Sequence, residues 1–173
     1  LQDPREETRR AAQELSAVKD PQAGPFLIES LSSGAALVVE QAALALVRVR
    51  DAAAVPALLR VLVSPWPEAA GAAFKALKAI NSDWPASAET RSALPHFLSS
   101  LRSADVGTRA NAASVLATLA PPSASAPLLE ALKQEPDPAI RGELAKAIAA
   151  IGDEASADPL LAAVAAETDD AAR

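Results

Sequence analysis

The sequence predicts an all-α solenoid of about five helical hairpins, and three observations lead to that prediction. Alanine supplies 44 of the 173 residues, whereas aromatic residues make up only 3%. Alanine has the highest helix propensity, and β-sheets favour β-branched and aromatic residues instead. Apolar residues also recur at helical spacing within units of about 31 residues. A single hairpin of this length cannot bury its apolar stripe, so stacked hairpins should share one continuous core.

The repeat boundaries follow from the last large apolar residue of each expected second helix. The steps between these residues are 31, 39, 31 and 32 residues, and the residues are Leu31, Leu62, Leu101, Leu132 and Val164. We therefore expect one domain over 1–173, with repeats at about 3–33, 34–64, 65–103, 104–135 and 136–168. The first helices share the core column Leu15, Leu46, Leu116 and Ile148, and the second helices share Leu27, Leu58, Leu128 and Leu160. The third repeat fits with Phe74, Leu77 and Ile80 in its first helix and eight extra residues in its loop.

The helix starts carry their own signals. Pro25, Pro56 and Pro95 fall in one column, and we expect this column in the first turn of each second helix, where proline is tolerated. The first helices of the fourth and fifth repeats open with Asp105 and Asp137, which are good N-caps. Each aspartate has an arginine four residues later, namely Arg109 and Arg141.

These residues give the chain a family resemblance. The segment Asp-Pro-Ala-Ile-Arg at 137–141, with Ala-Ile-Ala-Ala-Ile-Gly-Asp at 147–153, resembles the short HEAT-like repeat first described in phycobilisome bilin lyases. The segment 54–62 resembles it too. The resemblance implies a right-handed superhelix with the second helices on its concave side. In the first three repeats the arginine column reads Thr8, Val39 and Ala70, and Trp66 replaces the capping aspartate. Asp–Arg contacts between repeats are therefore expected only in the C-terminal half.

Most catalytic and metal-binding chemistry is excluded by composition. The chain has no cysteine and one histidine, His96, so thiolate sites, disulfides and histidine pairs cannot form. It contains no phosphate-binding loop and no nucleophile elbow. The acidic residues between Asp153 and Asp170 do not have the spacing of an EF-hand. We expect no catalytic residue, no bound metal and no cofactor, and hence no enzyme.

Charge and hydropathy limit the partners further. The net charge is −6, and a nucleic-acid binder normally presents a basic face, so no nucleic acid is expected. No apolar run reaches the roughly 18 residues of a membrane span. The absence of cysteine suits both cytoplasm and periplasm, with the cytoplasm slightly favoured. The compartment is therefore left open.

The second helices present a solvent-facing row that is a candidate binding surface. The row consists of Glu29, Arg60, Ser99, Glu130 and Ala162, and one turn further on come Ser32, Val63, Arg102, Lys133 and Ala165. A solvated face and a shallow groove for a protein or peptide both fit this pattern. Trp84, in the extra loop 81–91, is either a binding hot spot or a cover for the end of its own first helix. We take Glu29, Arg60, Trp84, Ser99, Arg102, Glu130 and Lys133 as the candidate partner-binding residues.

The function predicted from these features is a non-catalytic protein-interaction scaffold. Solenoids offer an extended concave surface, and segment 34–103 is the only part with net positive charge, at +2. An acidic or phosphorylated partner would complement Arg60, Arg102 and Lys133. The alternative suggested by the resemblance is a subunit of a bilin-lyase-like protein-modifying assembly.

The end of the sequence repeats an earlier pattern. Asp169 and Arg173 follow Asp137 and Arg141 by 32 residues, so 169–173 should open a sixth repeat. The last apolar face, which includes parts of Ile148 and Val164, would then be covered by further repeats or by end-to-end self-association.

Overall fold

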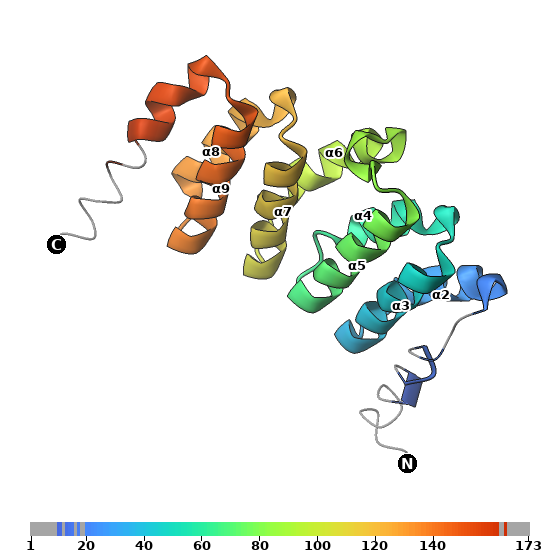
Figure 1. Ribbon diagram of the computed structural model, residues 1–173. Coiled ribbons are helices and arrows are strands. Elements are labelled where there is room, and N and C mark those ends of the chain that lie inside the picture. Colours follow the sequence, from blue (N-terminus) through green and yellow to red (C-terminus); the bar gives the residue numbers. More distant parts are fainter. Residues whose placement is uncertain (1–9, 12, 16, 18–19, 163–164, 166–173) are drawn as a thin grey trace, which may run out of the picture. The chain divides into compact units, whose positions relative to one another are not determined.

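The computed structural model describes residues 10–11, 13–15, 17, 20–162 and 165 (Figure 1). Within these residues the chain consists of α-helices and short 3-10 helices joined by turns, without a strand. The all-α prediction is therefore confirmed. The predictions for Thr8, Val164 and residues 169–173 lie outside the described residues.

The helices follow the expected hairpins. Repeat 1 contains η1 (Pro21–Ala23) and α2 (Gly24–Ser30), and repeat 2 contains α3 (Ala36–Val49), η2 (Ala52–Ala54) and α4 (Val55–Val61). Repeat 3 contains α5 (Pro67–Ile80), η3 (Trp84–Ala86) and α6 (Ala88–Ser100). Repeat 4 contains α7 (Val106–Leu119), η4 (Pro122–Ala124) and α8 (Ser125–Gln134). Repeat 5 contains α9 (Pro138–Ile151) and η5 (Glu154–Ser156), and residues 157–162 continue as helix.

The contacts along the chain form two compact units, which we call unit 1 (residues 1–94) and unit 2 (residues 95–173). In unit 1, α3 packs beside α5, α2 packs on α3, and α4 packs on α5 (Figure 1). In unit 2, α7 packs beside α9, and α8 packs on α9. Each unit thus stacks the first helices of neighbouring repeats in one layer and sets second helices against them, as a solenoid does.

The core lies on the predicted columns. Leu46 and Leu116 in the first helices, and Leu58 and Leu128 in the second, are fully buried. Phe74 was expected in the same core, but its side chain is 39% exposed. The equivalent positions in repeats 2 and 4 are the buried alanines Ala43 and Ala113. In repeat 3 the larger Phe74 ring instead meets Trp84 edge-on and stays partly exposed.

Helix ends explain where the first helices begin and stop. Asp105 Oδ1 accepts a hydrogen bond from Thr108 N at 2.7 Å, and Asp137 Oδ1 accepts from Ala139 N at 2.8 Å, so both predicted N-caps are confirmed. The helices α3, α7 and α9 each end at a residue in the left-handed conformation, namely Arg50, Ala120 and Gly152. These shared caps keep each turn into the second helix alike.

The third repeat departs from the others at Pro95. This proline lies inside α6 and not in its first turn, because the extra residues extend the helix toward its N-terminus and are not all loop. The first-turn prediction is therefore wrong at this position. Proline has no N–H, so the carbonyl of Arg91 receives no helical hydrogen bond from residue 95. The division between unit 1 and unit 2 falls here, between Leu94 and Pro95.

Candidate partner-binding face

Six of the seven candidate residues are on the surface of the second-helix layer. Glu29 on α2 and Arg60 on α4 are exposed in unit 1. Unit 2 contributes the exposed residues Ser99 on α6, Arg102 directly after α6, and Glu130 and Lys133 on α8. Val63, expected in the same row, is buried instead, so that part of the prediction is wrong. The seventh candidate, Trp84, is discussed below.

A cleft in unit 2 includes one of these candidate residues, Arg102. The cleft has a volume of about 320 Å³ and lies where α6 and α8 end. It is lined by Leu101, Arg102, Ser103, Arg109, Ala131, Gln134, Glu135 and Pro136. The structure thus brings the candidate Arg102 into a concave site, whereas Lys133 is not a lining residue and directly precedes the lining residue Gln134 on α8.

The cleft contains an ion pair between the first helix of the fourth repeat and the residue that follows its second helix. Arg109 Nε donates to Glu135 Oε2 at 2.7 Å and Arg109 Nη2 donates to Glu135 Oε1 at 3.1 Å, and the side chains are only 13% and 4% exposed. Arg109 Nη1 also donates to the carbonyl oxygens of Ser103 at 2.9 Å and Ala104 at 3.2 Å. The Glu135 carboxylate accepts a further bond from Asp137 N at 3.0 Å. Both charged groups are therefore satisfied within the protein.

The ion pair shifts both ionisation equilibria toward the charged forms. The hydrogen bond from Arg109 lowers the pKa of Glu135, and burial opposes this effect only in part. The same hydrogen bond is the main reason why the pKa of Arg109 is raised. Because the pair stays ionised and fully bonded, it acts as a fixed part of the cleft and is not poised for proton transfer.

The charges left for a partner are positive. Neither Arg102 nor Lys133 forms an ion pair with a residue that the structure describes. The nearby carboxylate of Glu130 accepts a hydrogen bond from Gln134 Nε2. Ser103 Oγ accepts from Asp105 N at 3.1 Å. An anionic group entering the cleft would therefore meet Arg102 first.

The repeat type is settled by comparison with known families. A family model described as HEAT repeats matches residues 1–87 and 94–173. The chain belongs to the HEAT-repeat family. The unmatched residues, 88–93, are the first part of α6, where the third repeat is extended. No curated protein matches the sequence.

In this HEAT-repeat protein the insertion of the third repeat packs inward. Trp84 is 2% exposed, and its ring meets Phe74 edge-on, with centroids 5.8 Å apart and planes at 86°. Thr90 Oγ1 donates to the carbonyl of Trp84 at 2.6 Å and holds the loop against the start of α6. The Trp84 ring is therefore not on the surface, and the structure shows the arrangement of the alternative, in which the ring packs on the first helix of its own repeat.

Two features of the HEAT-repeat stack were missed from the sequence. The partner of Arg109 is Glu135, in the linker to the next repeat, and not a capping aspartate. A signal existed, because Glu135 follows Arg109 by 26 residues and Glu167 follows Arg141 by the same step. The second feature is a hydrogen bond between the fourth and fifth repeats, in which Ser125 Oγ donates to Asp153 Oδ2 at 2.9 Å. This bond is the first cause of the lowered pKa of Asp153.

In the described part of the chain, no group of three or more histidine, aspartate or glutamate side chains is arranged to hold a metal ion. The described helices include none with the length and apolar character needed to cross a membrane.

Proposed function

We propose that this HEAT-repeat protein is a non-catalytic scaffold that binds a protein partner through the second-helix face of unit 2. HEAT repeats generally mediate protein–protein interaction. The observation that carries the proposal is the cleft beside α6 and α8, with Arg102 in its wall and Lys133 next to it. An extended segment of the partner would lie across the ends of the two helices.

The free cations favour an acidic or phosphorylated segment. A carboxylate or phosphate can accept two parallel hydrogen bonds from an arginine, which gives Arg102 geometric as well as electrostatic selectivity. At about 320 Å³ the cleft is at the lower end of the size range of ligand pockets, so it suits a few side chains of a peptide. Unit 2 contains 11 acidic and 6 basic residues, so the positive charge of Arg102 and Lys133 is local, which suits a short acidic segment better than the long run of phosphates in a nucleic acid.

The lining residues support binding more than catalysis. They include no histidine, and their one carboxylate, Glu135, is paired with Arg109. Their one hydroxyl, Ser103 Oγ, is bonded to a backbone amide and has no base among the lining residues. A nucleophile needs a neighbouring base within hydrogen-bonding distance, so this cleft has no means of activating one.

Three charge reversals, two on the proposed face and one control, test the proposal. The affinity-tagged chain and its Lys133→Glu, Arg102→Glu and Lys146→Glu variants are used to retain proteins from an extract of the source organism, with quantification by mass spectrometry. Lys146 is an exposed lysine of the same unit, but it lies on the first helix α9. We expect a set of proteins to be reduced at least tenfold by Lys133→Glu and Arg102→Glu and to be unchanged by Lys146→Glu. Equal loss with all three variants, or no loss with any, would refute the second-helix face as the binding surface.

A further inference from the structure

The charged residues that line the cleft of unit 2 leave it with a single unbalanced positive charge. Three lining residues are charged, namely Arg102, Arg109 and Glu135. Arg109 and Glu135 balance each other through hydrogen bonds at 2.7 and 3.1 Å, and both side chains are largely buried. Arg102 is exposed and is not part of that pair. One guanidinium group is therefore available to an incoming anion.

The other charges around the cleft do not raise this total. Asp105 and Asp137 cap the helices that follow the two linkers, and the negative charge of each contributes to the raised pKa of Arg109. Segments 101–109 and 130–141 contain all the lining residues, and they also hold three further carboxylates and two further cations. These are Glu130, Asp105 and Asp137, and Lys133 and Arg141. The surroundings of Arg102 are therefore not a broad basic patch.

The helices that end at the cleft also disfavour a strongly negative group. Helix α6 ends at Ser100 and α8 ends at Gln134, and six of the lining residues lie at or directly after these ends. The last carbonyl oxygens of a helix have no helical N–H partner and give its C-terminus a partial negative charge. A phosphate group carries a charge of about −1.5 to −2 at neutral pH, which Arg102 alone does not balance. A carboxylate, with one negative charge, matches the single guanidinium group.

The rest of the lining provides an apolar wall. Leu101, Ala131 and Pro136 line the cleft together with the charged residues. Leu101 is buried, Ala131 is half-buried and Pro136 is exposed, so an apolar side chain laid against them would be removed from water. The cleft has a volume of only about 320 Å³, so this wall and Arg102 are close together. A partner must therefore present its carboxylate and its apolar group within a short stretch of chain.

The geometry of an extended chain sets the spacing of the two groups. Successive side chains of an extended segment point to opposite sides, and side chains at positions i and i+2 point to the same side. Two groups that enter one small cleft from one segment are therefore separated by one residue. Adjacent positions would direct one of the two side chains away from the protein.

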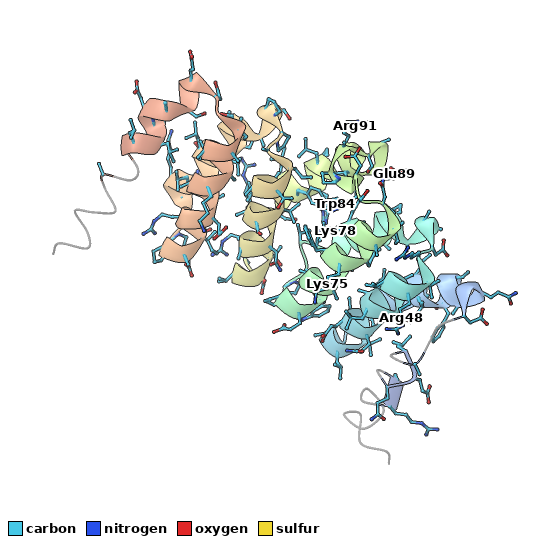
Figure 2. The ribbon with its side chains drawn as sticks, in the orientation of Figure 1. Arg48, Lys75, Lys78, Trp84, Glu89 and Arg91 are labelled. Atoms are coloured by element: carbon cyan, nitrogen blue, oxygen red, sulfur yellow. The ribbon has the colours of Figure 1, made fainter. Side chains whose placement is uncertain are left out.

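The exposed basic residues of unit 1 stand among acidic ones. Arg48 on α3 and Lys75 and Lys78 on α5 are exposed in the first-helix layer (Figure 2). Glu40 on α3 and the exposed Glu68 on α5 belong to the same two helices. This surface mixes both signs of charge, so Lys78 provides a control for binding that depends on exposed cations alone.

We propose that the cleft of unit 2 binds a segment in which a carboxylate side chain and an apolar side chain are separated by one residue. The carboxylate contacts Arg102, and the apolar side chain lies against Leu101, Ala131 and Pro136. This inference rests on the proposed function and narrows it, because it excludes a phosphorylated residue as the group that Arg102 recognises. The contact is small and the ion pair is exposed, so a short peptide binds weakly, with a dissociation constant on the order of 1 mM.

Titration of the isotope-labelled full chain with short peptides, followed by NMR of its amide groups, tests this specificity. The peptides consist of glycine and serine, carry Leu-Ser-Glu or Glu-Ser-Leu at their centre, and have both ends blocked. The tighter of the two should shift the amide signals of Ser103 and Gln134. Glutamine for glutamate, serine for leucine, or direct adjacency of the two residues should each raise the dissociation constant about fivefold or more, because each change removes one of the two contacts. Phosphoserine in place of glutamate should raise it as well.

Two variants of the chain test the assignment of Arg102. Arg102→Gln should raise the dissociation constant of the tighter peptide about fivefold or more, and Lys78→Gln should leave it unchanged. Circular dichroism establishes that both variants are folded.

Four results would each overturn the proposal. They are equal affinity when leucine is replaced or moved next to glutamate, tighter binding of the phosphoserine peptide, unchanged affinity of Arg102→Gln, and the absence of shifts at the cleft with every peptide. None of them decides the proposed function, which fails separately when Arg102→Glu and Lys133→Glu leave the retention of proteins from the extract unchanged.

Discussion

Replacing Glu135 by alanine should destabilise unit 2 strongly, although the residue lies in a linker. The change removes two hydrogen bonds from the Arg109 guanidinium, at 2.7 and 3.1 Å, and one from Asp137 N at 3.0 Å. It also leaves the Arg109 charge, only 13% exposed, without its counter-ion. Removing one partner of a buried ion pair costs about 3–5 kcal/mol. Arg109 keeps its bonds to two backbone carbonyls and some contact with water, so we expect about 2–4 kcal/mol.

Urea unfolding followed with two probes measures this loss where it should occur. Both tryptophans of the chain, Trp66 and Trp84, belong to unit 1, so their fluorescence reports on that unit, whereas circular dichroism reports on all helices. Glu135→Ala should lower the urea midpoint of the part of the dichroism transition that comes from unit 2. The midpoint followed by tryptophan fluorescence should stay unchanged. The control is Lys146→Ala, which removes an ion pair whose lysine side chain is 70% exposed and should cost less than about 0.5 kcal/mol. If both variants lost the same small amount, the Arg109–Glu135 pair would not be a main source of stability.

The same pair predicts a pH dependence with a definite sign. The pKa of Glu135 is lowered in the folded protein, so the unfolded chain binds more protons in the acid range. The stabilisation is therefore present at neutral pH and is lost as the pH falls from about 5 through the lowered pKa. The difference in unfolding free energy between the parent chain and Glu135→Ala should shrink on acidification, and a constant difference down to about pH 3 would contradict the assigned cause.

The remaining predictions concern packing in each unit. Leu46→Ala and Leu116→Ala should each lower the free energy of unfolding in urea by about 2–5 kcal/mol. Tryptophan fluorescence should report the first loss, and dichroism alone the second. Losses below about 0.5 kcal/mol would show that these columns are not core. Trp84→Ala should lower the stability of unit 1 by about 3–5 kcal/mol and leave partner retention through unit 2 unchanged. Gly24→Ala places a Cβ 2.0 Å from Asp51 Oδ2, so the Asp51 side chain must turn away, which weakens its bond from Ala53 N at the start of η2. Thermal unfolding should show a lower melting temperature, and the loss should largely disappear in an Asp51→Ala background.

The repeat architecture could be predicted from sequence because it depends on one periodic property. Leucines such as Leu46 and Leu116 recur in register, and burial of one stripe per helix fixes both the helices and the way neighbouring repeats stack. The caps Asp105 and Asp137 could be predicted for the same reason, since capping depends only on residues three or fewer positions away.

The predictions that failed concern features that depend on contacts between residues distant in sequence. The environment of Trp84 is set by Phe74 and Thr90, which sequence spacing alone does not place beside it. The first-turn prediction for Pro95 failed because the eight extra residues of the third repeat were assigned to its loop. Residues 88–94 carry no loop signal, and the helix starts at Ala88. The role of Glu135 requires the path of the linker between repeats, although its constant distance from the arginine column was visible.

Site-specific photo-cross-linking tests the central claim, that this HEAT-repeat protein binds its partner through the second-helix face of unit 2. A photoreactive residue is placed at Ser99, on α6 near the cleft, or at Ser114, on the first helix α7 of the same unit, and both positions are exposed. After irradiation in an extract of the source organism, the Ser99 position should yield covalent adducts with a protein partner that Arg102→Glu abolishes, and the Ser114 position should yield none. Adducts at Ser114 alone, or adducts at Ser99 that Arg102→Glu leaves unchanged, would contradict the claim.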